Sequence, residues 1–151
     1  MPSKLETYDN ATRALMAQAA KYNIKSDNGF TLSEMVQKLR ASYKQKLTFH
    51  KVFGGFMRGE HDPATGFCAV TSYYIYEQTG GDAVWDFMQT PVHWWLRHKQ
   101  TGETFDITYT QFDKPFPYEI GTPDVRINDD YKFRNMLQHE SQILARCAGL
   151  E

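Results

Sequence analysis

The segment at residues 66–81 reads GFCAVTSYYIYEQTGG, and the rest of the chain is interpreted from it. Gly66 stands just before a run of residues that favour a helix, and the glycine pair at 80–81 supplies a left-handed stop. Val70, Tyr73 and Tyr74 recur at helical spacing, so this side of the segment should be buried. The segment therefore predicts a core helix with a cysteine in its first turn.

Cys68 would occupy a special electrostatic position in such a helix. The unpaired amides of the first turn and the positive end of the helix dipole point toward its sulfur. These surroundings favour the thiolate, which is the nucleophilic form of cysteine. Alternatively, Cys68 is a small buried hydrophobic residue, which is the commoner role of a free cysteine.

Composition bounds the class of protein. Of the 151 residues, 41% are hydrophobic and 15% are aromatic, which predicts one packed domain over residues 1–151. The net charge of −1 gives no global attraction to nucleic acid or membranes. The two cysteines, Cys68 and Cys147, have no zinc-finger spacing, so we expect neither a metal site nor a cofactor. The N-terminal residues lack the apolar core of an export signal, so we expect a cytoplasmic protein.

Residues 1–60 are predicted to form a helical N-terminal part of the same domain. A first helix is expected over residues 9–22, capped by Asp9 or Asn10. Thr31 and Glu34 have the spacing of a capping box, which predicts a second helix from residue 32. Residues 49–59 mix aromatic residues with glycines, which is typical of a loop.

A basic run without any acidic residue lies between residues 35 and 59. Such a run fits a contact surface for an acidic protein or a nucleic acid, and aromatic residues interleave with it as in single-strand binders. It also fits a solvated helix face. Its basic members are Lys38, Arg40, Lys44, Lys46, Lys51 and Arg58.

After residue 81 the hydrophobic period changes to that of β-strands. Short strands are predicted over residues 83–88, 92–98 and 103–109, and the last of them alternates and is β-branched. Prolines make residues 113–125 an extended loop, and a last helix is expected over residues 129–147. The fold class predicted is α+β, with N-terminal helices and a C-terminal helix packed on a small antiparallel sheet.

Three separated residues have the chemistry of a thiol hydrolase, namely Cys68, His93 and Asp106. A thiolate attacks an acyl carbon, an imidazole carries the proton, and a third polar group orients the imidazole. If the loop between the last two strands has an even number of residues, as in a two-residue turn at 100–101 or a four-residue loop at 99–102, His93 and Asp106 share a face. An odd loop puts them on opposite faces unless a bulge restores the parity. Phe105 and Ile107 flank Asp106, and strand parity alone leaves open which of the three point inward.

Four motifs in this order resemble the YunG-like family of small bacterial proteins. They are GFCAVT at residues 66–71, GGD at 80–82, HWW at 93–95 and GETFDITYTQF at 102–112. The family looks like a compact relative of the papain-like cysteine hydrolases. The resemblance thus implies a papain-like thiol hydrolase core, with its motifs in residues 66–112. It also implies that Cys68 is the nucleophile, His93 the base and Asp106 the orienting group.

Two classes of function follow from these observations. A papain-like peptidase, amidase or deamidase would act on an amide, isopeptide or thioester through a covalent acyl-enzyme, with Tyr73, Trp94 and Trp95 lining the cleft or the core behind it. A transglutaminase-like acyl transferase would use the same three residues. The alternative is a non-catalytic binding protein that uses the basic run. An enzyme should show fast alkylation of Cys68 below pH 7, whereas a binder should be sensitive to salt.

Overall fold

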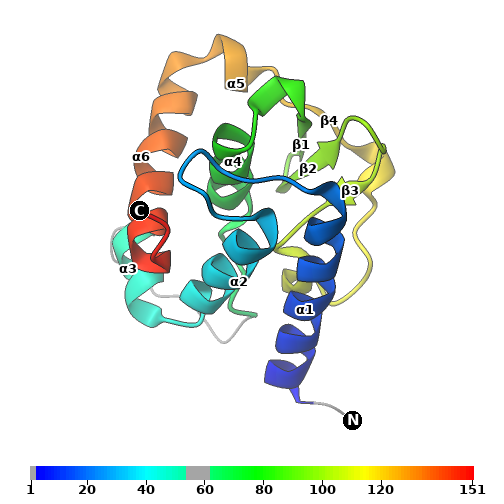
Figure 1. Ribbon diagram of the computed structural model, residues 1–151. Coiled ribbons are helices and arrows are strands. Elements are labelled where there is room, and N and C mark those ends of the chain that lie inside the picture. The colour runs from blue at the N-terminus through cyan, green and yellow to red at the C-terminus, as the bar shows by residue number, and fades with distance from the viewer. Residues whose placement is uncertain (1–2, 54–61) are drawn as a thin grey trace.

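Two N-terminal helices lie antiparallel along one side of the molecule. The computed structural model describes residues 3–53 and 62–151. In it α1 (Lys4–Tyr22) and α2 (Leu32–Tyr43) pack against each other (Figure 1). The Ser33 hydroxyl donates a hydrogen bond to the Met16 carbonyl between them. The pair forms a helical hairpin, which agrees with the prediction that the N-terminal part is helical.

The starts of these helices follow from local capping. The predicted capping box at Thr31 and Glu34 is confirmed, with each side chain bonded to the backbone amide of the other. The predicted start of the first helix is wrong, because the Ser3 side chain accepts a hydrogen bond from the Glu6 amide and α1 begins at residue 4. Asp9 and Asn10 therefore lie inside α1.

A third helix, α3 (Lys46–Phe53), occupies part of the segment that was predicted to be a loop. Thr48 and Val52, four residues apart, are buried, and α3 packs against the C-terminal helix. Burial of one face against α6 thus stabilises a helix here, although the glycines that follow in the sequence favour a loop. Residues 54–59 of the predicted loop lie outside the described part of the chain.

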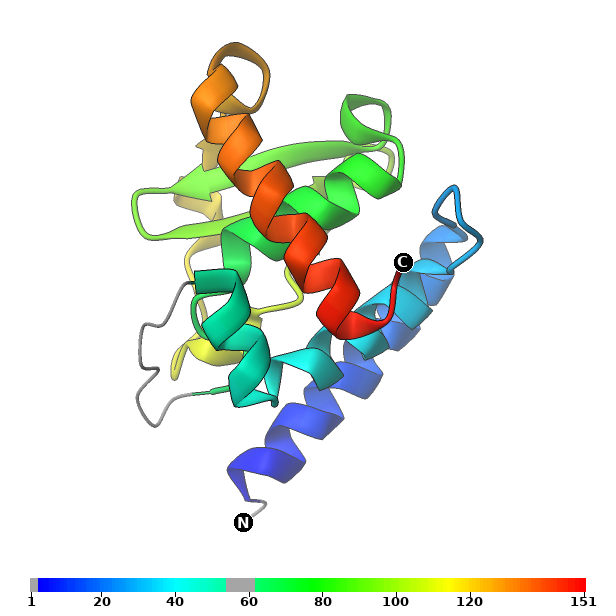
Figure 2. The same cartoon turned by 90° about the vertical axis from the view of Figure 1, so that its left-hand side faces the viewer.

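The predicted core helix is α4 (Cys68–Gln78), and it lies at the centre of the fold. Every residue from 70 to 76 is buried, since α4 is enclosed between the sheet and α6 (Tyr131–Ala148), which crosses it (Figure 2). Gly80 and Gly81 follow its end with φ of +105° and +56°, which confirms the expected left-handed stop.

The sheet has four antiparallel strands in the order β3-β2-β1-β4. They are β1 (Trp85–Thr90), β2 (His93–His98), β3 (Thr104–Phe105) and β4 (Thr122–Pro123). The third strand is shorter than predicted because the chain turns at Asp106. β4 forms inside the predicted proline-rich loop, where it pairs with β1 as an edge strand, a position that tolerates proline.

The two faces of this sheet have different covers. Trp85, Phe87 and Leu96 belong to the main apolar core with the helices. Trp95, which alternates with Leu96, instead contacts the rings of Phe116 and Tyr118 from the segment at residues 112–121. We call residues 112–121 the covering segment. The fold is thus the predicted α+β arrangement of N-terminal helices, antiparallel sheet and C-terminal helix.

Short elements connect these parts. They are the 3₁₀ turns η1 (Gly81–Ala83), η2 (Tyr109–Gln111) and η3 (Tyr118–Ile120), and the single-turn helix α5 (Arg126–Asp129). Asp130 caps α6 by accepting a hydrogen bond from the Phe133 amide, so the last helix begins two residues later than predicted. Among the helices of the described residues, none has the length and apolar character needed to cross a membrane.

Candidate functional site

Cys68 is the first residue of α4, as the sequence predicted. Gly66 precedes it with a φ of +90°, and Phe67 is fully buried and stacks on Tyr43 with ring centroids 4.4 Å apart. These two residues fix the direction in which the helix starts. Among the described residues no side chain caps this end of α4, so no described capping side chain competes with the Cys68 sulfur for the positive end of the helix.

His93 is the first residue of β2, and its side chain is fully buried. The ring packs on Trp95 with centroids 5.6 Å apart, and on Phe112 and Phe116 at 4.7 and 4.9 Å. Its Nε2 lies 2.6 Å from Oδ2 of Asp106. The aromatic rings exclude water and the carboxylate orients the imidazole, so the ring has one orientation.

Asp106 follows β3 directly and is saturated with hydrogen bonds. Oδ1 accepts from the backbone amide and the hydroxyl of Thr108, both at 3.1 Å. Oδ2 accepts from His93 and from the Tyr118 hydroxyl, the latter at 2.7 Å. Such a set of donors compensates the cost of burying a carboxylate, which here has an exposed fraction of only 5%.

The register between β2 and β3 explains how the two side chains meet. Leu96 pairs with Phe105, and the His98 amide bonds to the Glu103 carbonyl across a four-residue loop. The loop therefore has an even number of residues, and His93 and Asp106 lie on the same face of the sheet. Phe105 and Ile107 are also buried, because the sheet is covered on both faces. The alternation of apolar and polar residues along this strand therefore does not by itself show which way Asp106 points.

The second nitrogen of His93 is left for the thiol. Nδ1 is buried and accepts or donates no hydrogen bond of ordinary geometry within residues 3–53 and 62–151. Burial favours the neutral ring, but the hydrogen bond to Asp106 and the interaction with Cys68 outweigh it and raise the pKa of His93 to about 9. Since Nε2 is bound to Asp106, the thiol acts on the Nδ1 side. The structure thus brings Cys68, His93 and Asp106 together.

The three aromatic residues expected to line a cleft lie differently around this cluster. Trp95 is buried beside the His93 ring. Trp94 points to the other face of the strand, where its indole donates to Asp124 at 3.0 Å. Tyr73 is buried in α4, and burial together with its bond to Glu77 raises its pKa. Of the three, Trp95 packs against the cluster, whereas Trp94 and Tyr73 pack in the main apolar core. Contact of these residues with a substrate stays a prediction.

The basic run does not form one surface. Arg40 is fully buried, which contradicts its predicted place on a contact surface. Its guanidinium donates to the carbonyls of Tyr8 and Ile107 at 3.0 and 2.6 Å and to Thr12 at 2.6 Å. Within the described residues, backbone carbonyls and threonine hydroxyls accept hydrogen bonds from its guanidinium.

The other basic residues have separate surroundings. Lys44 pairs with Asp9 at 2.7 Å, and the ammonium of Lys38 lies over the Phe30 ring. Lys51 is exposed. The Lys46 side chain and Arg58 lie outside the described part of the structure. A basic contact surface therefore stays a prediction only for a smaller set of lysines.

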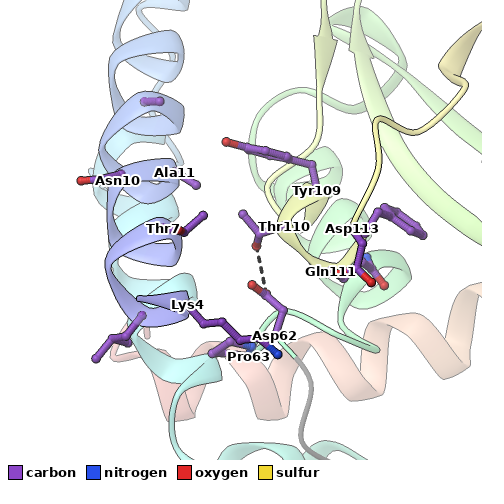
Figure 3. A pocket seen from close by; sticks show the side chains of 13 residues that line it. Lys4, Thr7, Asn10, Ala11, Asp62, Pro63, Tyr109, Thr110, Gln111 and Asp113 are labelled. Atoms are coloured by element: carbon purple, nitrogen blue, oxygen red, sulfur yellow. Dashed lines mark hydrogen bonds between the residues drawn. The ribbon is translucent and has the colours of Figure 1, made fainter. Parts of the chain in front are cut away.

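A groove of about 960 Å³ runs between the first half of α1 and the segment at residues 109–113 (Figure 3). Its lining is mixed in polarity and includes Lys4, Asn10, Asp62, Tyr109 and Asp113. Phe112 also lines the groove and contacts His93, whereas Cys68 does not line it. The groove therefore reaches Phe112, one of the aromatic rings packed around His93, but not the Cys68 sulfur.

The model of the YunG protein family matches residues 31–148. The chain belongs to this family. Neither the curated proteins nor the solved structures gave a match. The YunG match is longer than the segment at residues 66–112 that carried the resemblance, and it includes α2, α3 and α6.

The YunG match includes the candidate cluster but only part of the groove. Cys68, His93 and Asp106 all lie within the matched residues, and so does the covering segment. α1, which forms one wall of the groove, precedes the match. Within the described residues no group of three or more His, Cys, Asp or Glu side chains is placed to hold a metal ion.

Sequence reasoning missed several residues around Asp106. Thr108 had a usable signal, because an aspartate followed two residues later by threonine often forms a side-chain-to-backbone turn. Gln111, which donates to the Thr108 hydroxyl at 3.0 Å, had none. Tyr118 follows two prolines, Pro115 and Pro117, within a segment of no periodicity, so its bond to Asp106 was visible only in the tertiary structure.

Proposed function

We propose that this chain is a cysteine hydrolase of the papain-like type, acting on an acyl carbonyl through a covalent acyl-enzyme. The observation that carries the proposal is the division of labour on the His93 ring. One nitrogen is bound to Asp106 at 2.6 Å. The other is buried, makes no hydrogen bond of ordinary geometry to the described residues, and is left to interact with the Cys68 thiol. A purely structural buried histidine would be expected to use both nitrogens.

The first half of the reaction forms an acyl-enzyme. With a raised pKa, His93 is protonated at neutral pH, and its positive charge stabilises a negative sulfur on Cys68. The sulfur attacks the carbonyl carbon and a C–S bond forms. The bond to the leaving group then breaks as His93 gives its proton to the departing amine or thiolate.

The second half restores the protein. A water molecule attacks the thioester carbon while neutral His93 accepts one of its protons. The C–S bond breaks, the acid leaves, and the electron pair returns to sulfur. Asp106 holds the ring throughout and stabilises its charged form, without itself taking the proton.

The start of α4 suits the charge that develops on the carbonyl oxygen. No side chain of the described residues caps its first-turn amides, so the Cys68 backbone amide is available as an oxyanion donor close to the reacting sulfur. The helix dipole acts in the same direction. An acyl transferase would use the same steps with an amine in place of water.

The experiment is alkylation of the native protein by iodoacetamide between pH 5.5 and 8, with peptide mass spectrometry of both cysteines. Cys68 retains an exposed fraction of 8% and Cys147 is more exposed, which makes Cys147 an internal control. At pH 6 we expect Cys68 to react at least roughly tenfold faster than Cys147 and to lose this advantage in His93→Ala.

A Cys147→Ser variant checks that the fast site is Cys68, and it should react like the wild type. The proposal is contradicted if Cys147 reacts faster at every pH, or if His93→Ala leaves the Cys68 rate unchanged. Either result would favour a binding protein on the same scaffold, which the lysines of the basic run would then make sensitive to salt.

A further inference from the structure

Tyr118 donates to the same carboxylate oxygen that binds His93. Its hydroxyl lies 2.7 Å from Oδ2 of Asp106, and Nε2 of His93 lies 2.6 Å from that atom. The other oxygen, Oδ1, is bound to Thr108 twice. The carboxylate charge that acts on the imidazole is therefore shared with a neutral donor.

The phenol of Tyr118 is held in place by packing. Its ring contacts Trp95 with centroids 5.1 Å apart and Phe116 at 5.3 Å. Trp95 in turn packs on His93. Gly121, three residues later, lies so close to the Trp95 indole that an added Cβ would overlap its ring atoms. The covering segment therefore presents one hydroxyl at one position beside Asp106.

Three titratable groups of the described residues act on His93 or Tyr118, namely Asp106, Cys68 and Tyr109. Those that act on His93 are Asp106, after β3, and Cys68, at the start of α4. Those that act on Tyr118 are Asp106 and Tyr109 of η2. Burial and then the Asp106 charge raise the pKa of Tyr118, so its hydroxyl stays protonated and remains a donor where His93 titrates.

We propose that Tyr118 is a positioning residue for the Cys68–His93–Asp106 cluster, which fixes the Asp106 carboxylate and weakens its hold on the His93 proton. The inference rests on the proposed function for its consequence, because a His93 that gives up its proton more readily is a better acid toward a leaving group. The geometry itself does not depend on that function. Tyr118 touches no reacting atom and acts through Asp106.

The test is the Tyr118→Phe variant, which removes the hydroxyl and keeps the ring contacts. The readout is the titration of His93 by NMR of its ring carbon–proton pair, assigned with His93→Gln. Without the second donor, Oδ2 binds the imidazolium more strongly, so we expect the pKa of His93 to rise by roughly half to one unit. The upper limb of the Cys68 alkylation profile should move with it.

Tyr131→Phe is the matched control, since Tyr131 is exposed at the start of α6, and its His93 titration should equal that of the wild type. An unchanged or lowered His93 pKa in Tyr118→Phe overturns the proposal, whatever the stability of the variant. Slow alkylation of Cys68 in the wild type would instead refute the hydrolase, while the NMR titration would still decide the role of Tyr118.

Discussion

At the scale of single residues, the protonation of His93 is the feature with most consequence. Burial disfavours the imidazolium, but Asp106 and Cys68 outweigh burial and raise the pKa from 6.5 to about 9. Protons thus bind the folded protein more tightly than the unfolded chain. The stabilisation is complete below pH 6.5 and is lost as the pH rises through 9.

This pH dependence is best measured in a Cys68→Ala background, where ionisation of the thiol makes no contribution. We expect the free energy of unfolding to fall by about 1–2 kcal/mol between pH 6.5 and 9.5, because the Asp106 interaction alone still favours the imidazolium. Urea denaturation across this range measures it.

The controls for this prediction are two further variants in the same background. His98→Gln, at the other end of β2, should keep the slope, since His98 bonds to Thr101 and not to a carboxylate. Asp106→Asn should remove it. A flat profile in the Cys68→Ala protein itself would contradict the prediction.

At the scale of elements, two parts of the chain enclose the cluster from opposite sides. α4 supplies Cys68 from within the helical layer, and the covering segment closes the face of the sheet that carries His93 and Trp95. The covering segment has little regular structure of its own. Its position depends on aromatic packing against Trp95 and on the absence of a side chain at Gly121.

Gly121→Ala should therefore displace the covering segment. The φ of Gly121 is −72°, which alanine adopts freely, so the effect is steric: the new Cβ would overlap the Trp95 ring. We expect a loss of about 1–3 kcal/mol in the free energy of unfolding by urea denaturation. Glu119→Ala, an exposed position in the same turn, should change it by less than about 0.5 kcal/mol. Equal midpoints for the two variants would show that the contact does not matter.

At the scale of the whole molecule, Arg40 joins parts of the chain that are distant in sequence. From α2 it bonds to Tyr8 and Thr12 on α1 and to the Ile107 carbonyl just after Asp106. Thr110, also in contact with Arg40, donates to Asp62 at 2.9 Å. The N-terminal hairpin is thereby connected to the segment that carries the candidate site, although α1 precedes the YunG match.

Arg40→Lys should be strongly destabilising even though it keeps the charge. A lysine ammonium has three donors and no planar fork, so some of the buried carbonyl and hydroxyl acceptors would lose their partner. We expect a loss of about 2–4 kcal/mol in urea denaturation. Lys51→Ala, at an exposed position of the same basic run, serves as the reference. An Arg40→Lys protein as stable as Lys51→Ala would contradict the role assigned to Arg40.

Local signals in the sequence determined the ends of α4 and the start of α2. Glycines at positive φ and a capping box act within a few residues, so their meaning does not depend on distant contacts. Ser3 carries the same kind of local signal, since its side chain caps α1, whereas Asp9 and Asn10, which have equally suitable side chains, lie inside the helix. The choice of Cys68, His93 and Asp106 came from residue chemistry and motif order.

Only the tertiary structure decided whether those three side chains meet. The parity of a four-residue loop set the face of Asp106, and a covering segment folded back over the sheet brought Tyr118 to its carboxylate. The basic run in which Arg40 lies predicts an exposed side chain. Arg40 is nevertheless buried, because carbonyls from two other segments accept its hydrogen bonds. The free energy of such groups depends on partners far along the chain, and no local pattern encodes those partners.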